Sequence, residues 1–224
     1  MTENTKTKSI LHYVRQSVLV TVILLIICGL LFPLALSGLG ALLFPEQANG
    51  DLAMADGKPV GSIHVGQDFT EPYFMKGRPS AYNYNTYYED ENGNQFYNDG
   101  SEFAGIGSGS NNYAPSNPAL AERVEADIAE FLKAHPDVKK EDIPTDLMTA
   151  SGSGLDPHIS PASAEIQIPE LAKASGLSEE VLKKIVEDNT KGRLLGIFGE
   201  ETVNVLGVNL DIALEMGLID SVEK

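Results

Sequence analysis

No charged residue occurs between Arg15 and Glu46, and the stretch between them consists mostly of aliphatic side chains. Its centre, residues 18–32, is interrupted only by one threonine, one cysteine and one glycine. A helix needs about 20 apolar residues to cross the hydrocarbon core of a bilayer. Because hydrocarbon offers no water to the backbone, such a segment must form its own hydrogen bonds as a helix. The sequence therefore predicts one transmembrane helix over residues 16–44.

A cleaved signal peptide is the alternative interpretation of this segment. Signal peptides have an apolar region of about 7–15 residues followed by a small-x-small cleavage site. This run is longer, and no such site follows it cleanly, so an uncleaved anchor is favoured. Pro33 removes one backbone N–H and is expected to kink the helix. Beyond it, Gly38, Gly40 and Ala41 are small enough to let another helix pack closely.

The charge distribution predicts the orientation of the helix. The first 45 residues hold three basic side chains, Lys6, Lys8 and Arg15, and one acidic side chain, a net charge of +2. The total is −16, so the rest of the chain carries −18. The positive-inside rule then places residues 1–15 in the cytoplasm and residues 45–224 outside the cytoplasm. We expect a single-pass protein of the cell membrane, in contact with its lipid.

The acidic composition and the scarcity of cysteine exclude several classes of function. Nucleic-acid binding requires basic footprints, so no nucleic-acid partner is expected. The single cysteine, Cys28, cannot form an intramolecular disulfide. The histidines His12, His64, His135 and His158 are scattered along the chain, and no metal site or covalently bound cofactor is predicted from them.

Residues 45–224 are expected to form one α+β domain with short helices and a small sheet. Residues 45–57 are polar and end in Asp56-Gly57, which predicts a connector that closes in a turn. Val60, Ile63 and Val65, which are bounded by glycines, favour a short strand over residues 60–65. A second strand is expected at residues 203–205, where apolar and polar residues alternate.

Helix start and stop signals predict the helices of this domain. Asn117 and Pro118 have the residue types of a helix cap and first position. Leu120, Val124, Ile128 and Phe131 follow at helical spacing, which predicts one buried face. The other expected signals are caps at Ser160, Ser178 and Asn209, a break at Pro169, and helix ends at Gly176 and Gly217.

Seven of the eight tyrosines lie between Tyr73 and Tyr113, and residues 82–113 are also rich in Asn, Gly and acidic residues. A tyrosine cluster can form a recognition surface because each ring combines an apolar body with a polar tip. A free-standing binding module that uses this segment is therefore one hypothesis. A polar surface loop is the other interpretation, and it is favoured.

Two segments are rich in glycine and serine, at residues 105–110 and 151–154. Neither has the Gly-Lys-Ser/Thr ending of a phosphate-binding loop. The first is expected to be a flexible loop and the second a tight turn. Backbone N–H groups of the second turn could also hold an anion.

An acid, an imidazole and two hydroxyls occur close together at Ser151, Ser153, Asp156 and His158. A serine hydrolase needs nucleophile, base and orienting group within hydrogen-bond reach. The chain has no Gly-x-Ser-x-Gly motif, so we predict no catalytic residue and a hydrogen-bonded turn or core role for His158. A membrane-anchored extracellular serine hydrolase is kept as the alternative.

Arg78 and Arg193 lie in segments flanked by glycine and proline. An arginine in a rigid turn often binds backbone carbonyls or a carboxylate through its planar fork of donors. A structural role is favoured for both, and contact with a partner subunit is the functional alternative.

Longer segments carry more specific information. They are EPYFMKGRPSA at 71–81, GSN at 109–111 with PSNPAL at 115–120, DLMTASGSGLDPHISP at 146–161, and GRLLG at 192–196 with VNVL at 203–206. Together with the N-terminal helix, these segments closely resemble the C subunit of the bacterial Kdp potassium-transporting P-type ATPase. The stretch at 82–106 is longer and more aromatic than that family's pattern, so no role is carried over to it.

The resemblance implies one subunit of an inward potassium pump. In that family a channel-like subunit carries potassium, another subunit hydrolyses ATP, and the C subunit supports assembly and acts as a catalytic chaperone that raises ATP affinity. ATP and K⁺ are thus handled by the complex. The candidates that the resemblance implies for nucleotide or subunit contact are Ser151, Gly152, Ser153, Gly154, Asp156, His158, Arg78, Asn117 and Arg193.

The predicted topology conflicts with direct nucleotide contact. With the N-terminus inside, the turn at 151–154 lies outside the cytoplasm, away from ATP. An effect on ATP binding would then have to pass through packed helices as a coupling free energy between sites.

Overall fold

The computed structural model describes residues 10–224, and Lys6 and Lys8 of the predicted cytoplasmic tail lie outside the described residues. The described chain opens with α1 (Ile10–Ile26), the π-helical segment η1 (Ile27–Leu31) and α2 (Phe32–Leu43). Together they form one helix of 34 residues that is long and apolar enough to cross a membrane. The helix begins before the expected start at residue 16, because α1 includes the more polar turn around Arg15.

Pro33 is accommodated by a local irregularity in this helix. It is the second residue of α2, and η1 directly precedes α2. A π turn is wider than an α turn, and it is one way in which a helix adjusts to the missing proline N–H. The small residues follow in α2, where a Cβ added at Gly38 or Gly40 would meet no atom of the described chain within 4 Å.

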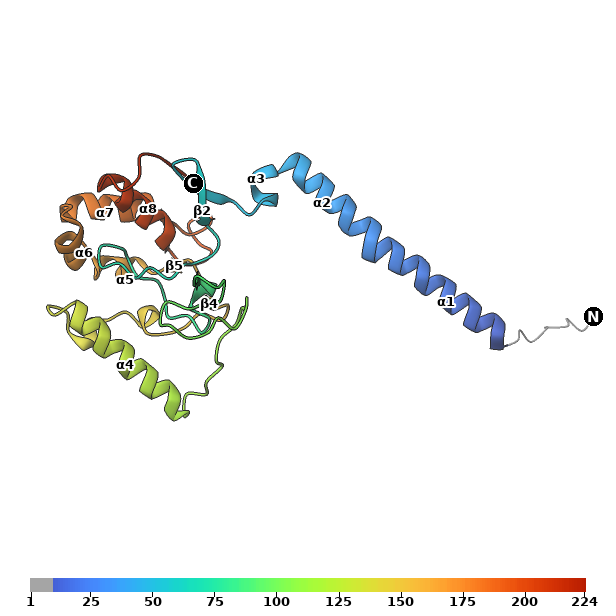
Figure 1. The fold of residues 1–224 in the computed structure, drawn as a ribbon, viewed down its shortest axis with the longest axis horizontal. Coiled ribbons are helices and arrows are strands. Elements are labelled where there is room, and N and C mark those ends of the chain that lie inside the picture. Colours follow the sequence, from blue (N-terminus) through green and yellow to red (C-terminus); the bar gives the residue numbers. More distant parts are fainter. Residues whose placement is uncertain (1–9) are drawn as a thin grey trace, which may run out of the picture. The chain divides into compact units, whose positions relative to one another are not determined.

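The chain divides into two compact units, residues 1–51 and residues 52–224, which are described separately. The first unit closes with a short helix, α3 (Pro45–Ala48). The second unit, called the C-terminal domain below, combines short helices with short strands, which confirms the α+β class (Figure 1). Its helical elements are η2 (Asn83–Asn85), α4 (Pro118–Ala134), η3 (Lys140–Asp142), η4 (Thr145–Leu147), α5 (Pro161–Glu165), α6 (Ile168–Ser175), α7 (Glu179–Asp188) and α8 (Val205–Glu215). Its strands are β1 (Leu52–Ala55), β2 (Lys58–Ser62), β3 (Tyr88–Glu89), β4 (Gln95–Phe96), β5 (His158–Ile159), β6 (Thr190–Lys191), β7 (Thr202–Asn204) and β8 (Val222–Glu223).

The strands of the described residues form small antiparallel sheets with the orders β2-β1-β8, β3-β4 and β5-β7-β6. β1 and β2 are joined by the expected turn, in which Asp56 and Gly57 have φ of 50° and 71°. Two left-handed residues are typical of the tightest hairpin turn. The polar connector predicted over residues 45–57 was wrong for residues 52–55, which form β1 and pair with β2 along the hairpin and with β8 near the end of the chain. The strand expected over residues 60–65 lies earlier, as β2.

Helix α8 lies at the centre of the C-terminal domain. Most of its residues are buried on all sides, as expected for a core helix. One side joins the main core, and the other packs on Ala53 and Ala55 of β1. The main core consists of Met75, Ile159, Ala164, Ile168, Leu171, Leu182, Ile185, Val203, Val205, Val208 and Ile212.

Helix α8 begins at Val205, so the prediction that Asn209 caps it was wrong. Asn204 takes the cap position, and its side chain accepts a hydrogen bond from Gly207 N at 2.9 Å. Asn209 lies inside the helix and is 2% exposed. Its side chain accepts from Met75 N at 2.7 Å and donates to Met75 O at 2.9 Å. The error arose because two asparagines precede apolar residues, and the earlier one begins the helix.

The remaining helix signals are confirmed. Asn117 caps α4, and its Oδ1 accepts from Ala119 N at 3.0 Å. Ser160 and Ser178 accept in the same way from the first turns of α5 and α7. The other confirmed signals are the Pro169 break, at the start of α6, and the ends at Gly176 and Gly217, with φ of 75° and 69°.

Helix α4 is less embedded than its sequence predicts. The face formed by Leu120, Val124, Ile128 and Phe131 is half-buried, and no residue of α4 is fully buried. In Figure 1, α4 (yellow-green) lies apart from α7 and α8 (orange to red). None of the four residues joins the main core, and only Phe131 lines a pocket.

Candidate functional site

One concavity of about 620 Å³ brings together four of the predicted site residues, Arg78, Asp156, His158 and Arg193. Arg78 Nη1 donates to Asp156 Oδ2 at 3.0 Å, and Arg78 Nε donates to the Thr149 carbonyl at 3.2 Å. The expected pairing of this arginine with a carbonyl and a carboxylate is thus confirmed. Arg78 ties the loop at 66–81 to the turn that carries the serine and glycine motif.

Asp156 is held in its charged form by its neighbours. Its Oδ1 accepts from His158 N at 3.0 Å, and His158 Nδ1 lies 3.5 Å from the same oxygen. The His158 side chain lowers the pKa of Asp156 most; burial acts in the opposite direction, and the His158 N–H and Arg78 lower it further. Arg78, Asp156 and His158 therefore form a connected polar cluster at β5.

Asp146 belongs to the same concavity, although sequence reasoning did not single it out. Its oxygens accept from Ser160 N at 2.7 Å, from Ser160 Oγ at 3.1 Å and from Ser163 Oγ at 2.7 Å. Burial raises the pKa of Asp146, but the hydrogen bonds from Ser163 and Ser160 outweigh burial and hold it below its ordinary value. The sequence did contain a signal for the role of Asp146. An acid precedes a Ser-Pro helix start, and the N–H groups and hydroxyls at such a start need an acceptor.

The serine and glycine motif at 151–154 forms the predicted tight turn. Ser151 Oγ accepts from Gly154 N at 2.9 Å, and Ser153 Oγ accepts from Leu155 N at 3.2 Å. The two hydroxyl oxygens are 3.3 Å apart. The turn therefore satisfies two of its own N–H groups with its own hydroxyls, which leaves fewer donors for an anion.

The glycine-rich segment at 105–110 is a loop, as predicted, and it contacts two other segments of the domain. Gly109 N donates to the Ser153 carbonyl at 2.7 Å. A Cβ at Gly107 would lie 2.3 Å from a carbon of the Tyr82 ring, and a Cβ at Gly154 would lie 2.5 Å from the Gly109 carbonyl oxygen. Glycine is required there because the Tyr82 ring and the second turn approach the backbone closely.

Part of the tyrosine-rich segment faces inward. Tyr84 Oη donates to the Arg78 carbonyl at 2.6 Å, and burial together with the charge of Asp156 raises the pKa of Tyr84. Tyr97 is buried, whereas Tyr87 and Tyr88 are exposed. Sequence reasoning missed the role of Tyr84 at the site, because Tyr84 lies in a segment whose composition is typical of a surface loop.

The arrangement of Ser151, Ser153 and His158 is not the one that a serine hydrolase requires. Among the described residues, neither Ser151 Oγ nor Ser153 Oγ has a hydrogen bond to His158. Each hydroxyl instead bonds to the backbone of its own turn, so the base and the nucleophile that catalysis requires are not paired.

The residues of the concavity around Arg78 and Asp156 also do not fit a nucleoside triphosphate. Its wall holds two guanidinium groups and four carboxylates, and one of the guanidinium groups, Arg78, is already paired. A polyphosphate requires an excess of donors and positive charge. The concavity is therefore unsuited to holding ATP.

Asn117 lies apart from the first concavity, whereas Arg193 lines it but is exposed. Asn117 caps α4 and lines neither concavity. Arg193 is half exposed, and its Nη2 lies 4.0 Å from Glu200 Oε2 across a hairpin. The hairpin adjoins the concavity, because Arg193 and Glu200 at its two ends both line it.

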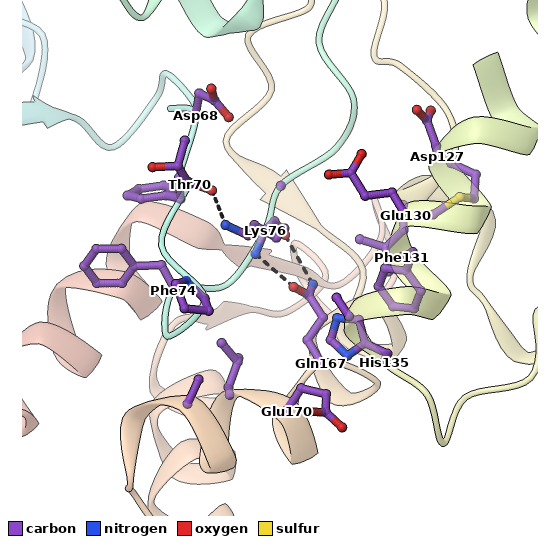
Figure 2. A pocket seen from close by; sticks show the side chains of 18 residues that line it. Asp68, Thr70, Phe74, Lys76, Asp127, Glu130, Phe131, His135, Gln167 and Glu170 are labelled. Carbon is purple, nitrogen blue, oxygen red and sulfur yellow. Dashed lines mark hydrogen bonds between the residues drawn. The ribbon is translucent and has the colours of Figure 1, made fainter. Parts of the chain in front are cut away.

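A second concavity, of about 710 Å³, lies between α4, α6 and the loop at 66–81, and it contains none of the predicted site residues (Figure 2). Lys76 stands in it near Asp68 and Glu130, and burial lowers the Lys76 pKa against the effect of these acids. Gln167, fully buried, accepts from Lys76 N at 2.8 Å and donates to its carbonyl at 3.2 Å. These bonds fix the loop on α6.

Among residues 10–224, no cluster of His, Cys, Asp and Glu is arranged to hold a metal ion.

The lowered pKa values of Asp146 and Asp156 predict acid sensitivity of the C-terminal domain. A carboxyl group whose pKa is lower in the folded state adds stability above its unfolded pKa of about 3.9, and this stability is lost as the pH falls through the folded pKa. Asp146→Asn should therefore cost about 1.5–3 kcal/mol at pH 7, since its hydrogen bonds are charge-assisted, and it should flatten the loss below pH 4. Urea unfolding of the full-length chain between pH 3 and pH 7 measures both effects. The exposed Glu91→Gln is the control, and parallel profiles for Asp146→Asn and the unmodified chain would contradict the assignment.

Comparison with known proteins gives a consistent result over most of the chain. A family model described as KdpC, the K⁺-transporting ATPase c chain, matches residues 14–214. A potassium-transporting ATPase KdpC subunit of Clostridium kluyveri is 58% identical, covering 92% of this chain and 96% of its own length. Proteins of the same description from Clostridioides difficile and Caldanaerobacter subterraneus are 52% and 44% identical, over 92% and 91% of this chain and 98% and 95% of their own lengths.

The matched range begins in the N-terminal helix and includes every residue of the concavity around Arg78 and Asp156. The chain therefore belongs to the KdpC family of K⁺-transporting ATPase c chains.

Proposed function

We propose that this chain is a non-catalytic accessory subunit of a high-affinity, ATP-driven potassium uptake pump. The family match over residues 14–214 and the potassium-transporting relatives carry this proposal. Its partners are a channel-like subunit that translocates potassium and a P-type subunit that hydrolyses ATP. A non-catalytic role is also supported by the turn at 151–154, because its two serine hydroxyls accept from backbone N–H groups while His158 lies beside Asp156.

The helix α1–α2 anchors the chain in the cell membrane, with its N-terminus in the cytoplasm and its C-terminal domain outside. The support is the charge difference of +2 before and −18 after the apolar segment. Cys28 is the only cysteine, so Ile106→Cys in a Cys28→Ala background gives one exposed thiol in the domain. A membrane-impermeant maleimide should label it in intact cells. Labelling only after permeabilisation would reverse the orientation.

The subunit acts on ATP indirectly. Outside the cytoplasm, the domain cannot touch ATP, so it raises the ATP affinity of the hydrolysing subunit through packing of α2 against partner helices, with Gly38, Gly40 and Ala41 at the contact. Small residues allow such close approach in a bilayer, and the result is a coupling free energy between distant sites. The acidic domain also attracts cations near the ion entry, within a Debye length of about 8 Å at physiological salt.

Purification from mild detergent through an affinity tag on this chain tests the proposal. The expected result is co-purification of a P-type ATPase subunit and a channel-like subunit. The same preparation without this chain should need a higher ATP concentration for half-maximal ATPase activity. A chain that is intact in the membrane but recovers neither subunit would contradict the proposal, whereas an unchanged ATP dependence would defeat only the chaperone role.

A further inference from the structure

The hairpin at residues 194–198, called the apolar hairpin below, exposes four large apolar side chains within five positions. Leu194, Leu195, Ile197 and Phe198 are 69%, 80%, 73% and 61% exposed. The hairpin is nevertheless fixed by backbone hydrogen bonds, because Leu194 N donates to the Phe198 carbonyl at 2.8 Å and Phe198 N donates to the Leu194 carbonyl at 3.0 Å. Its shape is thus set before any partner binds.

The tip of the apolar hairpin is also strained. Leu195 has φ of 55° and Gly196 has φ of 74°. Glycine adopts this region freely, but a branched apolar side chain such as leucine is disfavoured in it. Because the Leu195 side chain is exposed, packing inside the domain does not explain why leucine holds this position. Strain at an exposed apolar residue indicates a contact made outside the chain.

The surroundings of the apolar hairpin favour a protein over a lipid surface. Glu200 and Glu201 follow its second arm, and both are exposed. Segments that enter the membrane interface are typically flanked by Trp, Tyr, Lys or Arg, and acidic side chains are repelled by anionic headgroups. Of these four types, only Arg193 and Lys191 lie nearby, and Arg193 faces Glu200. An apolar tip whose second arm leads into two exposed acids fits an apolar pocket that has basic side chains on that side of its rim.

We propose that the apolar hairpin inserts its tip into an apolar pocket on another subunit of the same pump, whose rim carries basic side chains that pair with Glu200 and Glu201. This inference rests on the proposed function, since it assumes that the chain is assembled with partner subunits. A rigid apolar protrusion makes an effective anchor because little conformational entropy is lost when it docks. The adjoining concavity, which contains Arg78 and Asp156, is then held at the edge of the interface.

Site-directed photo-crosslinking in the assembled pump tests this docking. Leu195→Cys in the Cys28→Ala background would carry a benzophenone maleimide, and irradiation should produce an adduct with one pump subunit. Leu218→Cys, at another exposed apolar residue of the domain, should give at most one-tenth of that adduct. An adduct with lipid alone, or no adduct in a pump that is otherwise intact, would overturn the proposal.

Leu195→Gly separates docking from folding. Glycine relieves the φ strain and removes the side chain, so the isolated full-length chain should be at least as stable as before. Its retention in the pump during washing with increasing detergent should nevertheless fall at least tenfold, whereas Leu218→Gly should be retained like the unmodified chain. Equal retention of Leu195→Gly would refute the docking role and leave the proposed function standing. If the unmodified chain recovers no pump subunit, the proposed function itself has failed.

Discussion

Replacing Asn209 with alanine is expected to lower the free energy of unfolding of the C-terminal domain by about 2–4 kcal/mol, because it leaves two buried backbone groups of Met75 without partners. The midpoint of thermal unfolding should fall by about 6–12 °C for a domain of this size. The chain has no tryptophan, and seven of its eight tyrosines lie in the C-terminal domain. Near-ultraviolet circular dichroism of the full-length chain in detergent therefore reports mainly on this domain.

Asn209→Asp and an exposed asparagine provide the controls for this prediction. Aspartate keeps the acceptor for Met75 N and loses the donor to its carbonyl, so it should also destabilise the domain. Asn94→Ala, in an exposed turn, should change the free energy of unfolding by less than about 0.5 kcal/mol. If Asn209→Ala behaved like Asn94→Ala, the two bonds to Met75 would not contribute to the stability of the fold.

Gly154→Ala is expected to cost about 2–3 kcal/mol, because its φ of 66° disfavours any side chain and its Cβ would lie 2.5 Å from the Gly109 carbonyl oxygen. Gly152, two residues earlier in the same motif, has nothing within 4 Å of an added Cβ and has no positive φ. Gly152→Ala should therefore change the stability by less than about 0.5 kcal/mol. Urea unfolding of both variants makes the comparison.

This pair also separates two explanations of the motif. If the turn at 151–154 serves the packing of Tyr82 and the loop at 105–110, the defect of Gly154→Ala appears in the purified chain alone, without any nucleotide. Comparable, small effects of both substitutions on stability, with a loss of ATP response in the complex, would favour direct nucleotide contact and contradict the structural role.

Local signals in the sequence predicted the parts of the fold that depend on neighbouring residues. The apolar run, the Asn117, Ser160 and Ser178 caps and the Asp56-Gly57 turn each depend on side chains within a few positions. Backbone hydrogen bonding and φ preferences determine whether such a signal forms a cap or a turn, and both act over the same short range. Where two similar signals compete, as at Asn204 and Asn209, residue type alone cannot decide between them.

Contacts between distant segments could not be predicted in the same way. β1 was missed because its run of Leu, Ala and Met has little strand preference of its own, and its pairing with β8, near the other end of the chain, gives no local signal beside the hairpin with β2. The partner of Asn209, Met75, is 134 residues away. A polar residue within an otherwise apolar helix was the available signal, since a buried amide requires partners.

For the candidate site, the type of each residue indicated its chemistry, but the sequence did not show which residues would lie together. The two arginines, Asp156 and His158 were singled out by chemistry, and the fold then placed them in one concavity. Asp146 and Tyr84 were missed because their roles depend on Ser163 and on the Arg78 carbonyl, which are supplied by other elements. The packing of the loop at 105–110 was missed for the same reason, since the ring of Tyr82 that contacts it belongs to a different part of the chain.

Growth at limiting potassium tests the proposed pump role most directly. A bacterial strain that lacks its other potassium uptake systems should lose growth at micromolar potassium when this gene is deleted in frame, and it should recover at millimolar potassium. The unmodified gene and the Gly152→Ala variant should both restore growth. Unimpaired growth of the deletion strain at micromolar potassium would contradict the account.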